Sequence, residues 1–175
     1  MTATVIGAIV VLLGAIVARN ATRYAAELQA AQRRRDSQLV ELKEFSDSVT
    51  ALIAATAKYV FVLHDMDLPT DADYAHVVSG LPEPQRQKRM SLLLDIVDKR
   101  ERSRALSSGI PWENIREQYM IIDTFAILFR DHKIVEALAW SNEHTDITMT
   151  LVALIGERRR ELLASPKPRR WSMFL

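Results

Sequence analysis

The chain has 175 residues, of which 49% are hydrophobic and 26% are charged, and its formal net charge is +1. This length suits one ordinary domain, or a membrane anchor followed by one small domain, and the composition allows a buried core. The small net charge excludes the strong overall field that draws many proteins to nucleic acid. The sequence has no cysteine, which excludes disulfides, thiolate metal sites and cysteine nucleophiles from these residues.

The N-terminal segment predicts a transmembrane anchor over residues 1–19. Its run from Ala3 to Ala18, ATVIGAIVVLLGAIVA, carries no charged side chain. Counted from Met1, a helix over this run extends about 27 Å, close to the ~30 Å hydrocarbon core of a bilayer. A cleaved signal peptide is one alternative, although the cationic segment expected before its apolar core is absent. A helix buried in a soluble assembly is the other, because the run is short.

The charges around this run predict its orientation. Arg19 and Arg23 follow it directly, and a cluster at Arg33, Arg34 and Arg35 comes next. By the positive-inside rule, the chain after the run lies in the cytoplasm and the N-terminus lies outside. We therefore expect a single-pass protein of the bacterial inner (cytoplasmic) membrane. Its C-terminal domain is expected to be cytoplasmic.

Small residues mark one face of the expected anchor. Gly14 and Ala18 are four residues apart, and Gly7 precedes Gly14 by one heptad. Such a face permits close packing between helices in lipid. The alternative is that Gly and Ala are simply frequent in membrane helices. Because residues 1–19 are expected to span a membrane, lipid is the first expected partner of the chain.

Residues 20–63 predict a long juxtamembrane helix, because no glycine or proline interrupts the chain between Gly14 and Pro69 and strong helix formers dominate. The sequence leaves open whether this helix breaks near Asp36–Ser37. A heptad seam then begins, whose alternating three- and four-residue spacing predicts helix packing or self-association. The seam consists of Leu42, Phe45, Val49, Leu52, Thr56, Tyr59 and Leu63. Ile53 and Val60 widen it, which favours a bundle over a bare two-stranded coiled coil.

The remaining chain predicts a loop, a bundle and a tail. Residues 64–83 read as an acidic loop with a short helix, and residues 166–175 read as a basic, aromatic tail. Residues 84–165 predict a helical bundle, with helices over about 84–107, from Pro111 past Phe129, and over about 145–164. The sequence leaves open whether the second of these continues through Leu138 and Trp140 or kinks near Asp131. The first of these is expected to bury Met90, Leu93, Leu94 and Val97. The second is expected to bury Trp112, Ile115, Tyr119, Ile122, Phe125 and Phe129, and the third Ile147, Leu151, Leu154, Ile155 and Leu162. The predicted fold is all-α: one N-terminal transmembrane helix continuing into a long helix, plus a small helical bundle.

The acidic loop holds the densest group of potential metal ligands, His64, Asp65, Asp67 and His76, with Asp71 and Asp73 between them. A divalent cation requires such groups to converge. Carboxylates at the start of a short helix are also favourable without any metal, and we prefer that interpretation. No catalytic residue, cofactor-binding residue or cofactor is predicted, and the sequence has no glycine-rich phosphate loop.

Two basic regions predict contact with a membrane surface or a partner. The first is Arg33, Arg34 and Arg35, and the second lies in the tail. The tail residues concerned are Lys167, Arg169, Arg170, Trp171 and Phe174. A solvated tail is the alternative. Nucleic acid is not expected as a partner, because no known module appears and the aromatic residues are not interleaved as stacking platforms.

The first 45 residues carry a resemblance of low specificity. The segment GAIVVLLGAIVA, followed by RNATRY and QRRRD, resembles the opening of small membrane proteins that are frequent in actinobacteria and their phages. The resemblance implies membrane anchoring. It also implies a role in phage–host conflict or an accessory role in a membrane assembly, and it transfers no catalytic residue.

These patterns predict a non-enzymatic, membrane-anchored assembly or interaction protein. It would be a homo-oligomer or an accessory subunit bound to other membrane proteins. The alternative is a phage- or defence-related effector that oligomerises through its transmembrane helix and breaches the membrane. An enzyme that uses the His/Asp loop is a third hypothesis.

Overall fold

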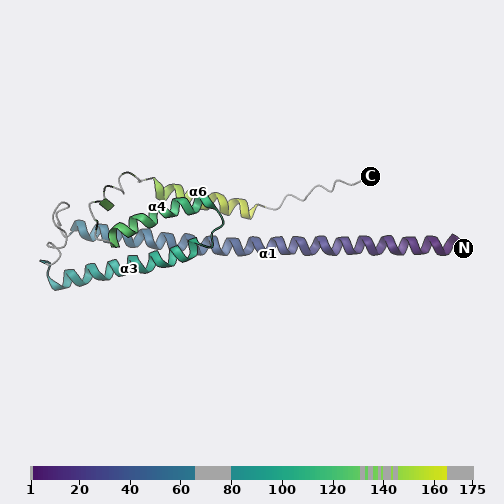
Figure 1. The fold of residues 1–175 in the computed structure, drawn as a ribbon, viewed down its shortest axis with the longest axis horizontal. Coiled ribbons are helices and arrows are strands. Elements are labelled where there is room, and N and C mark those ends of the chain that lie inside the picture. The colour runs from purple at the N-terminus through teal and green to yellow at the C-terminus, as the bar shows by residue number, and fades with distance from the viewer. Residues whose placement is uncertain are drawn as a thin grey trace. The chain divides into compact units, whose positions relative to one another are not determined.

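The computed structural model describes residues 2–65, 80–130, 133, 136–137, 139, 143 and 146–164, without the side chains of residues 2–14, 16, 64 and 65. Four α-helices and no strand occur in these described residues (Figure 1). The helices are α1 (Thr2–Asp65), α3 (Glu83–Ser107), α4 (Glu113–Arg130) and α6 (Ile147–Leu163). The all-α fold expected from the sequence is therefore confirmed.

The chain divides into two compact units, Met1–Leu39 and Val40–Leu175. In the first unit, every described side chain is exposed or half-buried. α1 runs through the expected anchor and juxtamembrane segments as one helix of 64 residues, and no break occurs near Asp36–Ser37. The division between the two units thus falls inside the segment expected as a single stalk, where apolar residues begin to recur at heptad spacing.

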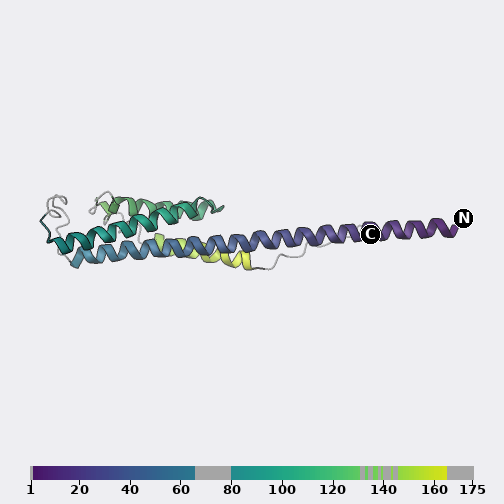
Figure 2. The same cartoon turned by 90° about the horizontal axis from the view of Figure 1, so that it is seen from below.

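The second unit is a bundle in which the part of α1 from Val40 onward packs with α3, α4 and α6. Consecutive helices run in opposite directions (Figures 1 and 2). This is an up-down-up-down order, in which each helix returns beside the preceding one. Pro82 and Pro84 lie at the start of α3, where a missing backbone N–H costs no hydrogen bond. Ser108 and Gly109 end that helix.

The heptad seam of α1 forms the centre of the bundle. All seven of its residues are buried, and Phe45, Leu52 and Tyr59 have no exposed surface. The Phe45 ring packs edge-on against Tyr119 of α4, with centroids 5.4 Å apart, and Tyr59 packs the same way against Phe129, also at 5.4 Å. These contacts, 14 residues apart on α1 and 10 apart on α4, fix the two helices side by side in the same direction.

The buried face of α3 differs from the expected one. Of the four residues expected inside, Leu93 is buried, Val97 is half-buried, and Met90 and Leu94 are 53% and 61% exposed. The face that is buried is partly polar. It comprises Arg89, Leu92, Leu93, Ile96, Arg100, Ser103 and Ser107. The expectation was wrong because it followed apolar side chains alone, whereas paired polar groups also occupy the interior.

α4 and α6 bury the faces that their spacing predicts. Seven of the residues expected inside α4 and α6 are buried: Ile115, Tyr119, Ile122, Phe129, Leu151, Ile155 and Leu162. Trp112, which directly precedes α4, and Phe125 on α4 are half-buried, as are Ile147 and Leu154 on α6. α4 also buries Asp123 and Ala126, which the apolar spacing did not indicate.

Among the described residues, one helix is long and apolar enough to cross a membrane, and it lies near the N-terminus. The criterion is met within Val17–Leu63 of α1, where an 18-residue window has a mean hydropathy of 1.3 and is 44% buried inside the protein. That burial reflects the seam, since a helix in a bundle core has the same length and composition as a membrane span. The uncharged run Ala3–Ala18 overlaps this stretch only at Val17 and Ala18, and the structure does not describe most of its side chains.

Candidate functional site

The predicted metal ligands do not fall in the part of the chain where side chains can be described. His64 and Asp65 are the last residues of α1, but their side chains are outside the description. Asp67 and His76 lie outside the described residues altogether. Among described residues, no group of three or more histidine and carboxylate side chains gathers as a metal site would require.

The predicted contact surfaces are described only in part. Ala18 is exposed. Gly7 and Gly14 belong to α1, but the structure does not describe what surrounds them. Arg33 and Arg34 are exposed and Arg35 is half-buried. The tail residues Lys167, Arg169, Arg170, Trp171 and Phe174 lie outside the described residues.

The seam predicted for helix packing or self-association is covered by the chain's own helices. The residues assigned to it are Leu42, Phe45, Val49, Leu52, Tyr59 and Leu63, and none is more than 7% exposed. A second copy of the chain finds no free area there while the bundle is closed. Self-association of the folded protein would have to use another surface.

A buried ion pair joins α3 to α4. Nε of Arg100 lies 2.8 Å from Oδ1 of Asp123, and Nη2 of Arg100 donates a hydrogen bond to Oδ2 of Asp123 over 3.0 Å. The two side chains are 7% and 2% exposed. The pair thus combines one hydrogen bond with a second close charge contact, and together they offset part of the loss of water.

Two hydroxyl groups complete this buried polar cluster, which we define as Arg100, Ser103, Tyr119 and Asp123. The hydroxyls of Ser103 and Tyr119 are 2.9 Å apart, and the Tyr119 hydroxyl donates to Oδ1 of Asp123 over 3.4 Å. Burial, assisted by the negative charge of Asp123, raises the pKa of Tyr119 to about 12. Ser103 and Tyr119 have no exposed surface.

The buried polar cluster is closed to substrate. A general acid or base has to reach the group whose proton it transfers. Ser103, Tyr119 and Asp123 instead direct their polar atoms at one another and at Arg100. Arg89 makes a similar internal contact, because its Nε donates to the Tyr59 hydroxyl over 3.0 Å. These groups therefore define which helix faces meet, and the arrangement offers no reacting atom a place beside them.

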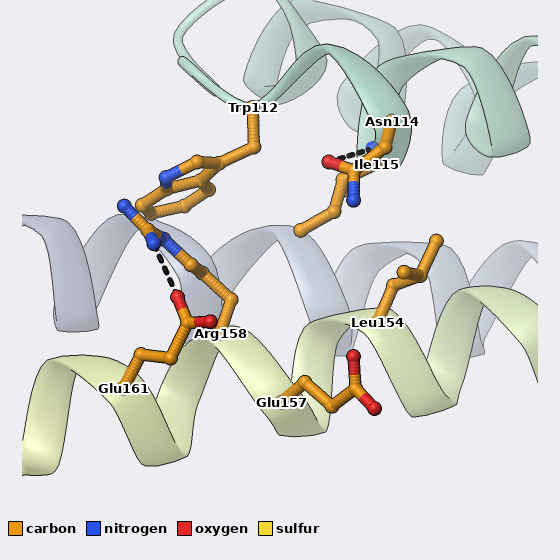
Figure 3. Close-up of a pocket in the computed structure, with 7 residues that line it drawn as sticks. All are labelled: Trp112, Asn114, Ile115, Leu154, Glu157, Arg158 and Glu161. Atoms are coloured by element: carbon orange, nitrogen blue, oxygen red, sulfur yellow. Dashed lines mark hydrogen bonds and ion pairs between the residues drawn. The ribbon is translucent and has the colours of Figure 1, made fainter.

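A small hollow of about 170 Å³ opens between the start of α4 and the end of α6 (Figure 3). Its lining residues are Trp112, Asn114, Ile115, Leu154, Glu157, Arg158 and Glu161. The Arg158 guanidinium lies 4.7 Å from the centre of the Trp112 ring and also pairs with Glu161. Ligand pockets usually enclose about 300–1,000 Å³. This hollow is smaller, and its one cation is already shared between a ring and a carboxylate.

Comparisons of the chain with protein-family models, with curated proteins and with solved structures found no match. Function must therefore be argued from the residues and their arrangement. What the described part of the chain presents is a bundle with internally paired polar groups, a helix apolar enough to span a membrane, and several exposed apolar and basic side chains.

Proposed function

We propose that this chain is a non-enzymatic, membrane-anchored protein whose helical bundle serves assembly or interaction. The observation that carries the proposal is the continuity of α1 from Thr2 to Asp65. One helix contains both the uncharged run Ala3–Ala18 and the buried seam of the bundle. A bundle built in this way is attached to the membrane by its own core helix.

The charges after the run support a cytoplasmic bundle. Arg19, Arg23, Arg33 and Arg34 are all exposed on α1, where they can remain hydrated or meet anionic headgroups. The positive-inside rule then places the bundle on the cytoplasmic side of a bacterial inner membrane. The internal pairing of the buried polar cluster supports a role other than catalysis, because those groups stabilise the fold.

The decisive experiment is to extract the full-length protein from its native membrane, measure the mass of the particle and identify everything that co-purifies. A defined homo-oligomer would support a self-assembling scaffold. A stable complex with other membrane proteins would support an accessory subunit. A monomer that binds nothing would contradict the proposal.

A measurement of membrane potential in cells separates the assembly role from that of a membrane-breaching effector. An effector that oligomerises through Gly7, Gly14 and Ala18 would collapse the membrane potential when its expression is induced. A potential-sensitive dye reports that collapse within one cell generation. An intact potential together with a defined complex would favour the assembly role.

A further inference from the structure

The part of α1 that belongs to the bundle is apolar on every side near its end. From Thr50 to Leu63 the sequence TALIAATAKYVFVL has one charged residue, Lys58. A helix that is apolar all round is normally covered all round. The bundle covers the seam side, but Phe61 keeps 70% of its surface exposed. An exposed phenylalanine on such a helix indicates a contact that the bundle itself does not make.

Phe61 belongs to a second heptad series on α1. The series alternates steps of four and three residues, as the seam does, and every member is exposed. At 100° per residue its members fall within about 80° of arc, roughly opposite the residues that this part of α1 buries. We call the series the outer face of α1, and it consists of Lys43, Asp47, Thr50, Ala54, Ala57 and Phe61. It lies wholly within the second unit, Val40–Leu175.

The middle of the outer face permits close approach by another helix. Heptad spacing is the pattern along which two helices pack, and Thr50, Ala54 and Ala57 have short side chains. In an antiparallel pair of copies, Thr50 of one copy can stack on Ala54 of the other. The seam is closed to a second copy because the bundle covers it. The outer face has no such restriction, since all six of its residues are exposed.

The charges of this part of α1 are complementary to those of a second α1 that runs in the opposite direction. In the antiparallel register just given, Glu44 lies beside Lys58 of the other copy, and two-fold symmetry forms this contact twice. Lys43 then lies over the ring of Phe61 of the other copy, and the face of an aromatic ring attracts a cation. Glu44 and Lys58 are exposed, and neither joins an ion pair with a described residue of its own chain.

We propose that the outer face of α1 pairs with the outer face of a second copy of the chain in antiparallel orientation. The inference rests on the assembly role proposed above, for which it supplies a surface and a partner. A parallel pair in register fits the same face less well. It would set Lys43 against Lys43 and Asp47 against Asp47 of the other copy, and like charges placed together cost binding energy.

An exchange of charges tests the pairing directly. Sedimentation equilibrium of the full-length chain in a mild detergent measures the dissociation constant of the dimer. Lys58→Glu sets two carboxylates together in each of the two contacts, and the dissociation constant should rise about tenfold or more. Glu44→Lys with Lys58→Glu restores opposite charges in exchanged order, and should recover the affinity of the unmodified chain. Arg102→Glu reverses an exposed charge on α3 and is the matched control, which should change nothing.

The exposed phenylalanine gives a second test. Phe61→Ala removes the ring that Lys43 of the other copy would meet, and should weaken the dimer about tenfold. Met120→Ala on α4, where the side chain is 52% exposed, is the control and should leave the dissociation constant unchanged. Because both residues are exposed, the bundle should fold in each variant, and circular dichroism checks this.

The direction of the pair can be read by cross-linking, because the sequence has no cysteine of its own. Full-length chains that carry Glu44→Cys are mixed with chains that carry Lys58→Cys and treated with a short bis-maleimide. An antiparallel pair should link the two kinds of chain to one another and should link neither kind to itself.

Three outcomes would overturn the proposal. A chain that stays monomeric at every concentration lacks the contact. A dimer that is indifferent to both Lys58→Glu and Phe61→Ala uses another surface. Linkage of Glu44→Cys chains to themselves identifies a parallel pair. The proposed function fails separately: a dimer that responds to these substitutions in a chain that does not float with membranes would keep the contact and contradict the anchor, whereas a monomer that co-purifies with other membrane proteins would keep the assembly role and reject the contact.

Discussion

At the scale of single residues, the most consequential feature is the ion pair between Arg100 and Asp123. Each group would be costly to bury alone, and each is compensated by the other together with Tyr119. This pairing also explains why the buried face of α3 was mispredicted. An arginine in a helical sequence is normally assigned to the surface, and a polar partner on a facing helix, here the Asp123 carboxylate, reverses that assignment. The sequence does contain Asp123 beside Ile122, but nothing in one helix reveals which residue of another helix it meets.

Removing one partner of this pair should destabilise the bundle strongly. Asp123→Ala leaves the Arg100 guanidinium buried without its counter-charge, and we expect a loss of about 3–5 kcal/mol in the free energy of unfolding. The double variant Arg100→Met/Asp123→Leu should recover most of that loss, because it replaces both charges by apolar groups of similar size. Urea unfolding of the full-length protein in detergent, followed by circular dichroism, measures both. Equal destabilisation in the single and double variants would mean that the pair is not what the single variant disrupts.

Tyr119 should make the bundle sensitive to alkali. Its pKa is raised from 10.0 to about 12 in the folded protein, chiefly by burial. Below pH 10 the phenol is neutral in the folded and unfolded states, and stability is unaffected. Between about pH 10 and pH 12 the unfolded chain loses this proton while the folded chain keeps it, so the free energy of unfolding falls.

The pH dependence can be isolated by substitution. Tyr119→Phe should flatten the fall in unfolding free energy between pH 10 and 12, whereas Tyr24→Phe, in the other unit of the chain, should leave it unchanged. The measurement is urea unfolding at several pH values in this range. A slope that is identical in Tyr119→Phe and the unmodified protein would show that other groups cause the alkaline loss.

At the scale of helices, predictability depended on whether a face is purely apolar. The seam of α1 was predicted residue by residue, because almost all of its positions carry apolar or aromatic side chains at unbroken heptad spacing. The face of α3 was predicted about one residue out of place, because Arg89, Arg100 and Ser103 occupy interior positions.

The register of α3 can be tested with two alanine substitutions. Ile96 has no exposed surface. Replacing it by alanine should lower the free energy of unfolding by about 2–5 kcal/mol. Leu94 is 61% exposed, so replacing it by alanine should lower the free energy of unfolding by no more than about 0.5 kcal/mol. Both changes remove similar aliphatic volume two residues apart on the same helix. A larger loss of stability in Leu94→Ala than in Ile96→Ala would instead support the buried face first expected from the sequence.

At the scale of the whole molecule, an all-α fold with a long first helix was readable from the sequence. Helix-forming residues without glycine or proline, and stops at Gly109 and Pro111, delimit the elements. α1 has two apolar parts, and the sequence alone does not decide which of them lies in a membrane. A bundle core and a bilayer favour the same apolar side chains. The seam is accounted for by the bundle. The run Ala3–Ala18 is the part whose composition leads us to propose a bilayer.

A charge placed in that run should release the protein from the membrane. Val10→Arg lies near the middle of the run, where an arginine costs about 2.5–3.5 kcal/mol in insertion. We expect a large fall in the fraction that resists extraction by alkaline carbonate, while Val10→Leu should behave as the unmodified chain. A reporter fused to the C-terminus that is active only in the cytoplasm should lose no activity in either variant. Undiminished retention of Val10→Arg would contradict anchoring by this run.

The paired charges between α3 and α4 have a consequence for how this protein can evolve. Replacing Arg100 or Asp123 alone leaves an isolated charge buried in the bundle. Because proteins are only marginally stable, such an intermediate should fold poorly and be selected against. The two positions are therefore expected to be inherited as a unit. Related chains should keep both charges, or should have exchanged both for apolar residues, and a surviving single exchange should be accompanied by a compensating change at the hydroxyl of Tyr119 or Ser103.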